Sequence, residues 1–131
     1  MAQNFSDSVA TAIQRAFALA EEKKQTEVTE NHLLLALLEE PEGYFAALLK
    51  ELGGAAQTLT PLAIKAVDLL PSYEQSGQPP QPARNLQARI QEAEQFAKEL
   101  NDSYISSDHL LLAYWKGGGE PFSSWKKGLN L

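Results

Sequence analysis

The sequence predicts an all-α fold built from two tandem copies of one helical unit, related by a pseudo-twofold axis. An internal repeat with a period of 77 positions places residues 32–36 (His-Leu-Leu-Leu-Ala) on the identical residues 109–113. Without a gap, residues 13–53 align with residues 90–130, and 13 of these 41 positions are identical. Apolar residues recur in both copies at three- and four-residue steps, which is the helical period. No strand pattern competes with it.

The repeat also predicts the domain organisation. A chain of 131 residues with 44% apolar content can bury one core, so we expect a single domain over residues 1–131. The first four-helix repeat should occupy residues 1–70 and the second residues 84–131. Four of the thirteen positions from 71 to 83 are proline, which predicts an extended connector. The counterpart of the first copy's fourth helix would start near residue 135, so we expect the second repeat to be truncated at Leu131.

The first helix of each copy is marked by an apolar stripe. In the first copy the stripe lies within residues 5–20, with Ser6 or Asn4 as the expected N-cap. In the second copy it lies within residues 86–100.

The second helix of the first copy should begin behind Thr29, a favourable N-cap residue. Val28 and Leu33 flank it at the spacing of a hydrophobic staple, and the same spacing recurs within residues 105–110. The runs that follow are apolar on nearly all sides, which indicates buried helices.

Third helices are predicted over residues 44–52 and 121–129, the latter with Pro121 at its first position. A fourth helix is predicted over residues 61–70, with Thr60 as its N-cap.

Composition and charge limit the class of partner. The chain contains no cysteine, and its first residues show no basic segment followed by an apolar run, so we expect a cytoplasmic protein. The longest strongly apolar run, residues 33–38, is far below the ~20 residues that span a bilayer, so no membrane partner is expected. The net charge is −6, and the basic residues cluster no further than adjacent lysine pairs such as Lys126-Lys127, which argues against nucleic acid.

We expect no catalytic site, cofactor or metal in this domain. The glycine run 117–119 lacks the Lys-Ser/Thr of a phosphate-binding loop, so it predicts a helix break and no ATP hydrolysis by this chain. His32 and His109 are repeat equivalents. They could form a metal or acid–base pair across the axis, or each could hydrogen-bond within its own copy. The second interpretation is favoured, because two histidines without carboxylate support make a poor zinc set.

Aromatic residues are concentrated in the second copy. They predict either a bulkier core, which is the favoured interpretation, or an exposed surface that binds apolar segments of a partner. They are Tyr104, Tyr114, Trp115, Phe122 and Trp125.

The doubled motif [VI]-[TS]-x-x-H-L-L-L-A resembles the Clp N-terminal domain, a double Clp repeat that begins the AAA+ unfoldases and disaggregases. The resemblance covers the whole chain. Residues 102–108, Ser6 and the proline-rich connector are most similar to the ClpB disaggregase branch. The resemblance implies a substrate-recognition domain that binds exposed apolar segments of unfolded or aggregated polypeptides weakly and passes them to a homohexameric AAA+ ring. ATP and Mg would bind in ATPase modules of the longer protein, and a co-chaperone or adaptor would be a further partner.

The resemblance also implies a groove beside the first helices of the two copies, with apolar walls and a polar rim. The acidic residue that usually precedes the histidine is Asn31 in the first copy, so phosphoarginine recognition, known in the ClpC branch, is not carried over. A serine found in some ClpB members near the start of the second copy is Ala83 here. The residues implied for substrate binding are Ser6, Asp102 and Asp108 on the rim, with Ile90 and Leu110 in the wall.

Two alternatives share the same fold. The chain could be an adaptor-docking domain of a ClpC- or ClpA-like protease unfoldase, or a stand-alone Clp accessory subunit. In each case the positions at which the copies differ are the better candidates for function. These pairs are Asn31 and Asp108, Gln25 and Asp102, and Leu38 and Trp115.

Overall fold

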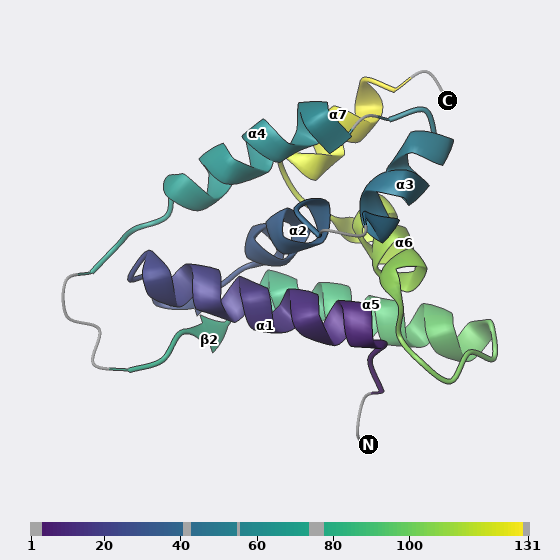
Figure 1. Cartoon of the computed structure of the whole chain (residues 1–131), viewed down its shortest axis with the longest axis horizontal. Coiled ribbons are helices and arrows are strands. Elements are labelled where there is room, and N and C mark those ends of the chain that lie inside the picture. The colour runs from purple at the N-terminus through teal and green to yellow at the C-terminus, as the bar shows by residue number, and fades with distance from the viewer. Residues whose placement is uncertain (1–3, 41–42, 55, 74–77, 130–131) are drawn as a thin grey trace.

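The computed structural model describes residues 4–40, 43–54, 56–73 and 78–129, and within them the fold is all-α, as predicted. Seven helices and one pair of two-residue strands make up these residues (Figure 1). None of these helices is both long and apolar enough to cross a bilayer. The elements are α1 (Asp7–Glu22), β1 (Glu27–Val28), α2 (Glu30–Leu38), α3 (Tyr44–Glu51), α4 (Ala56–Asp68), β2 (Gln81–Pro82), α5 (Arg84–Glu99), α6 (Ser107–Gly117) and α7 (Phe122–Lys127).

The internal repeat is visible in the backbone. Helix α5 begins 77 positions after the start of α1, and the ends of the two helices are separated by the same interval. The turn after each contains a non-glycine residue with positive φ, Lys24 at 56° and Asn101 at 59°, again at equivalent positions of the repeat. Helices α2 and α6 then start behind the equivalent N-caps Thr29 and Ser106. The two copies therefore share the same local structure as well as similar sequences.

Each copy sends the segment before its first helix across to the other copy. In the β1–β2 pair, Val28 of the first copy lies opposite Pro82 of the second. The isolated bridge between Phe5 and Ile105 is the same pairing with the copies exchanged. Sequence patterns do not reveal strands of two residues, because alternation needs a longer run. The predicted all-α fold therefore holds, with Gln81 and Pro82 of the predicted extended connector forming one of the two short strands.

Helix α2 is the most deeply buried element, since Asn31 is its one residue that is not buried. Its equivalent, α6, is less covered: Leu112 is 41% exposed, whereas Leu35 at the matching position of α2 is 4% exposed. The difference arises because α4 packs on α2, and no helix of the described residues takes the corresponding place on α6. The predicted burial of both apolar runs is thus confirmed for α2 and only in part for α6.

The aromatic residues of the second copy divide between core and surface. Tyr114, Phe122 and Trp125 are buried, with ring centroids 5.7 Å apart for Tyr114 and Phe122 and 5.6 Å apart for Phe122 and Trp125. The bulkier core is confirmed for these three. Trp115 is half-buried and Tyr104 is exposed.

The fourth helix begins earlier than predicted. Helix α4 starts at Ala56 and contains Pro61, although the pattern predicted a start at Pro61 behind a Thr60 cap. The Thr60 hydroxyl instead donates to the carbonyl oxygen of Ala56 at 2.8 Å. Burial of an apolar stripe on both sides of the proline outweighs the backbone hydrogen bond that proline removes. The buried residues of α4 are Leu59, Ala63 and Val67.

Helix α7 is shorter than predicted, with Pro121 at its N-cap position rather than inside it.

The N-caps of α1 and α5 offer a matched pair of substitutions. The Ser6 side chain accepts a hydrogen bond from the backbone N–H of Val9 at 3.3 Å, whereas Ala83, with nearly the same φ and ψ, makes no cap bond. We expect Ser6→Ala to lower the free energy of unfolding by about 1 kcal/mol and Ala83→Ser to raise it by about as much. Urea denaturation measures both. Unchanged stability in the two variants would contradict the assigned caps.

Candidate functional site

An open apolar groove of about 370 Å³ lies between α1 and α5, the first helices of the two copies. The two helices run in opposite directions (Figure 1). Six of the eight lining residues are apolar, the other two carry amides, and none is charged. Leu86 is buried at the base, and the rest are half-buried or exposed. The lining residues are Phe5, Ile13, Phe17, Pro82, Leu86, Gln87, Ile90 and Gln91.

The sequence of α1 explains why the side chains that this helix contributes to the groove stay partly exposed. Ala12, Ala16 and Ala20 form the buried stripe, and their small side chains let the helix approach the core closely. Ile13 and Phe17 follow two of these alanines by one position, so they lie at the edge of the stripe rather than beneath it. They pack against the core with one side and leave the other side in the groove.

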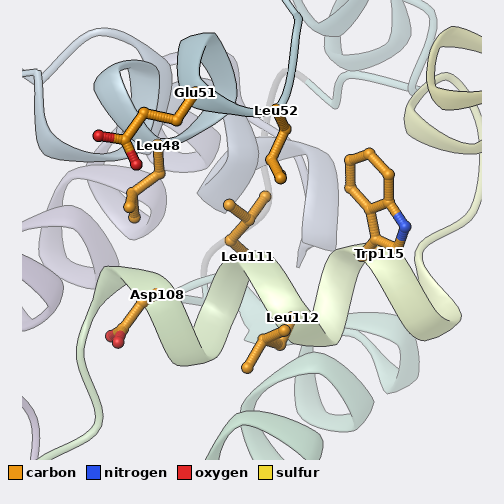
Figure 2. A pocket seen from close by; sticks show the side chains of 7 residues that line it. All are labelled: Leu48, Glu51, Leu52, Asp108, Leu111, Leu112 and Trp115. Atoms are coloured by element: carbon orange, nitrogen blue, oxygen red, sulfur yellow. The ribbon is translucent and has the colours of Figure 1, made fainter. Parts of the chain in front are cut away.

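A second apolar groove, of about 340 Å³, lies between α3 and α6. Figure 2 shows the side chains of α3 directed toward α6, with the carboxylates of Glu51 and Asp108 on one side and Trp115 on the other. Helix α4 covers the matching face of α2, so the α3–α6 groove lies where a further helix would pack. Its lining residues are Leu48, Glu51, Leu52, Asp108, Leu111, Leu112 and Trp115.

Ser6 and Asp108 lie in a hollow that continues this second groove and shares Leu48 and Glu51 with it. Both are already engaged at helix ends. Ser6 caps α1, and Oδ1 of Asp108 accepts hydrogen bonds from the backbone N–H of His109 at 3.1 Å and from the Ser106 hydroxyl.

Asp102 lies elsewhere, with Oδ2 2.7 Å from Nε2 of the buried His109. Nδ1 of the same ring accepts the backbone N–H of Ser106 at 2.9 Å. Because Nδ1 is the acceptor, we assign the proton of the neutral ring to Nε2, which donates to Asp102. The carboxylate is thus used to orient a histidine.

His32 makes the equivalent contacts in the first copy. Its Nδ1 accepts the backbone N–H of Thr29 at 2.8 Å, and its Nε2 lies 2.6 Å from Oε1 of Gln25. The prediction that each histidine hydrogen-bonds within its own copy is confirmed. Gln25 and Asp102 therefore differ in sequence but make the same structural hydrogen bond, each to the histidine of its own copy. Within the described ranges no three His, Cys, Asp or Glu residues form a group able to hold a metal.

Leu110 is not a groove residue. Its side chain is 0% exposed and belongs to the core, so the prediction that it forms a wall is wrong. Its repeat equivalent Leu33 is also 0% exposed. The identity of the two positions in the repeat had already indicated that both leucines belong to the scaffold.

The structure therefore distributes the predicted site residues over three places instead of one. Ile90 lies in the α1–α5 groove, Asp108 in the α3–α6 groove with Ser6 beside it, and Asp102 against His109. The other groove residues of α1 were predicted as core. The repeat offered a signal for them, because Ile13 is the equivalent of Ile90.

Known proteins resemble this chain in sequence and fold. Residues 4–128 match the Clp repeat (R) N-terminal domain. Chaperone protein ClpB of Chlamydia pneumoniae is 45% identical over 125 residues, which cover 95% of this chain and 14% of that protein. The Hsp104 N-terminal domain from Candida albicans has a TM-score of 0.78 at 22% identity, covering 95% of this chain and 79% of that one. A ClpV N-domain in complex with a VipB peptide has a TM-score of 0.75 at 21% identity, covering 97% and 79%.

Proposed function

The chain belongs to the Clp repeat (R) N-terminal domain family, and from this premise we propose that it is the substrate-recognition domain of a ClpB-like disaggregase. It spans 14% of the length of its ClpB relative, so the ATP- and Mg-binding modules of an AAA+ ring would lie in the rest of the protein. In this proposal the domain captures apolar segments of unfolded or aggregated polypeptides and passes them to the homohexameric ring.

The α1–α5 groove is the observation that carries this proposal. The fold leaves the apolar side chains of its walls partly exposed, and the amides of Gln87 and Gln91 carry no charge. Such a groove would recognise an exposed apolar segment by its character rather than its sequence. The volume of about 370 Å³ is at the small end of ligand sites, which suits a few side chains.

Weak binding follows from the size of the groove. Buried apolar area contributes about 25 cal/mol per Å², and the loss of translational and conformational freedom offsets much of it. A feeder domain has to release what it captures, so weak binding is suited to the role. The ClpV N-domain that holds a VipB peptide supports peptide binding by this fold.

The α3–α6 groove suggests a second candidate function, the docking of an adaptor or co-chaperone through a helix. The observation in its favour is that α4 covers the equivalent face of α2. Its carboxylates, Glu51 and Asp108, would favour a helix with basic residues at one end.

A charge placed in each groove separates the two sites. Ile90→Lys puts an ammonium group into the α1–α5 groove, and Leu112→Lys puts one on the exposed face of α6 as the matched control. Burying an isoleucine side chain contributes about 1.5–3 kcal/mol, so we expect Ile90→Lys to weaken binding of an unfolded apolar polypeptide by about tenfold or more. Leu112→Lys should leave it unchanged. Fluorescence anisotropy with a labelled reduced, unfolded polypeptide measures both.

Two results would contradict the assignment. Loss of binding in Leu112→Lys with retention in Ile90→Lys would move client capture to the α3–α6 groove. Absence of binding by the unsubstituted domain would exclude the proposed function. Circular dichroism of both variants shows whether they keep the helical fold.

A further inference from the structure

The α1–α5 groove lies on the pseudo-twofold axis that relates the two copies. Its lining contains two pairs of residues that are each 77 positions apart, Ile13 with Ile90 and Phe5 with Pro82. Because α1 and α5 are themselves equivalent and run in opposite directions, a half-turn about the axis exchanges the two walls (Figure 1).

The two ends of the groove are built in the same way. At one end Pro82 is paired with Val28 of the first copy, and at the other Phe5 is paired with Ile105 of the second. The N–H of the residue after each of them is bonded to the opposite copy, from Ala83 over 2.9 Å and from Ser6 over 3.0 Å.

Resting on the proposed function, we propose that this groove binds an extended apolar segment in both chain directions. A segment that lies across the axis meets the Ile13–Ile90 pair in the same way after it is reversed by a half-turn, and it meets Phe5 where it had met Pro82. Direction in peptide recognition usually comes from main-chain hydrogen bonds to a sheet edge. Here Pro82 has no N–H, and its carbonyl oxygen accepts a hydrogen bond from Nε2 of Gln87 at 3.0 Å. Side chains therefore carry the recognition at this end, and an apolar side chain stands at each end, Pro82 at one and Phe5 at the other.

The symmetry of the lining is incomplete, because the repeat equivalents of Phe17, Leu86, Gln87 and Gln91 do not line the groove. Phe17 lines the groove near Pro82, and its equivalent at the other end is Glu94, which lines the adjoining hollow with Asn4. Glu94 lies 3.9 Å from the ammonium group of Lys98. With Phe17 at one end and Phe5 at the other, each end has an aromatic ring, and the carboxylate of Glu94 beside the Phe5 end alone gives one direction a modest advantage. A segment with a basic residue at one terminus should prefer the direction that places it beside Glu94.

The occupant that fits is an uncharged extended segment with a few large apolar side chains. No lining residue carries a charge, and the groove volume is about 370 Å³. Capture without regard to direction suits a domain whose ligands have no common sequence.

Paramagnetic labelling tests the proposal. A ten-residue Leu/Phe/Ala peptide carries a nitroxide at its N-terminus or, in a second sample, at its C-terminus, and the broadening of domain amides is measured by NMR. We expect either label to broaden amides at both ends of the groove, at Phe17 and Leu86 and at Phe5 and Glu94. The populations of the two directions should lie within about tenfold of each other, equivalent to about 1.4 kcal/mol.

Exchange of the asymmetric pair provides the matched variants. Glu94→Phe removes the carboxylate that is present at one end alone and should bring the two populations closer to equal, and Phe17→Glu should do the same by placing a carboxylate at each end. Broadening confined to one end by each label, in the unsubstituted domain and in Glu94→Phe, would overturn two-way binding while leaving client capture in place. Absence of any chemical-shift change at the groove would overturn both.

Discussion

Replacing Arg89 with alanine is expected to lower the free energy of unfolding by about 3–5 kcal/mol, the typical cost of removing one partner of a buried ion pair. The Arg89 guanidinium on α5 lies 3.5 Å from Oε1 of Glu30 on α2, and both side chains are buried. It also contacts Glu92 at 3.3 Å. Without it, the carboxylate of Glu30 would be left in the interior with no cation.

Glu30 is one of the points at which the first copy is bound to the second. Its Oε2 accepts the backbone N–H of Gly119 at 3.1 Å, and its own N–H donates to Oδ1 of Asn85 at 3.0 Å. Its carbonyl oxygen accepts the Tyr114 hydroxyl at 2.5 Å. Three contacts beside Arg89 thus converge on one residue from α5, α6 and the loop before α7, so its disturbance should loosen the packing between copies.

The pH dependence distinguishes a lost ion pair from a simple cavity. Burial raises the pKa of Glu30; the Gly119 N–H and the Arg89 guanidinium lower it, and Glu92 raises it. Removing Arg89 should raise this pKa further, so the folded variant favours the protonated carboxyl. That stability is present at low pH and lost as pH rises through the folded pKa. The deficit relative to the unsubstituted domain should therefore be larger at pH 8 than at pH 5.

Urea denaturation at the two pH values measures the Arg89 effect. Arg84→Ala, an exposed position at the start of the same helix, is the control and should change stability by less than about 0.5 kcal/mol. Arg89→Met combined with Glu30→Gln removes both charges and should cost less than Arg89→Ala alone. A loss below about 1 kcal/mol in Arg89→Ala, or the same loss at both pH values, would show that the ion pair does not hold the copies together.

The repeat and the capping residues were enough to predict most of the architecture. A helix start is specified within a few residues, so Ser6, Thr29 and Ser106 can be recognised as N-caps from the sequence alone. The limits appear where distant segments decide. Pro61 indicated a helix start locally, but packing of α4 on α2 extends the helix beyond it.

The site was predicted only in part, because an apolar pattern does not say which side of a residue is covered. Leu110 and Leu112 belong to one apolar run, yet the first is 0% and the second 41% exposed. Leu110 belongs to the core cluster, whereas Leu112 is exposed because no described helix takes on α6 the place that α4 takes on α2. The glycine run is similar: a helix break was predicted, but a Cβ at Gly117 would also lie 2.9 Å from the guanidinium of Arg89 on α5, so the glycine leaves room for that side chain.

Acidification from pH 7 to pH 4 is expected to cost about 3 kcal/mol of stability through His32 alone. Its ring is 0% exposed, and burial, aided by the charge of Lys23, lowers its pKa from 6.5 to about 4. Protonation would put a hydrogen on Nδ1, which now accepts the Thr29 N–H at 2.8 Å. The unfolded chain protonates near pH 6.5 and the folded one near pH 4. Stability is therefore complete above about pH 6.5, declines as pH falls, and levels off below about pH 4.

The comparison with His32→Asn isolates this contribution. Asparagine can still accept the Thr29 N–H through its side-chain oxygen but does not titrate, so the variant should lose about 3 kcal/mol less than the unsubstituted domain between pH 7 and pH 4. Glu30, whose raised pKa acts in the opposite direction over the acidic range, is present in both proteins, so its effect cancels in the difference. Urea denaturation series at half-unit pH steps provide the two curves. Parallel curves would mean that His32 accepts a proton in the folded domain as readily as in the unfolded chain. The assignment of a buried, neutral ring that bonds the Thr29 N-cap would then be wrong.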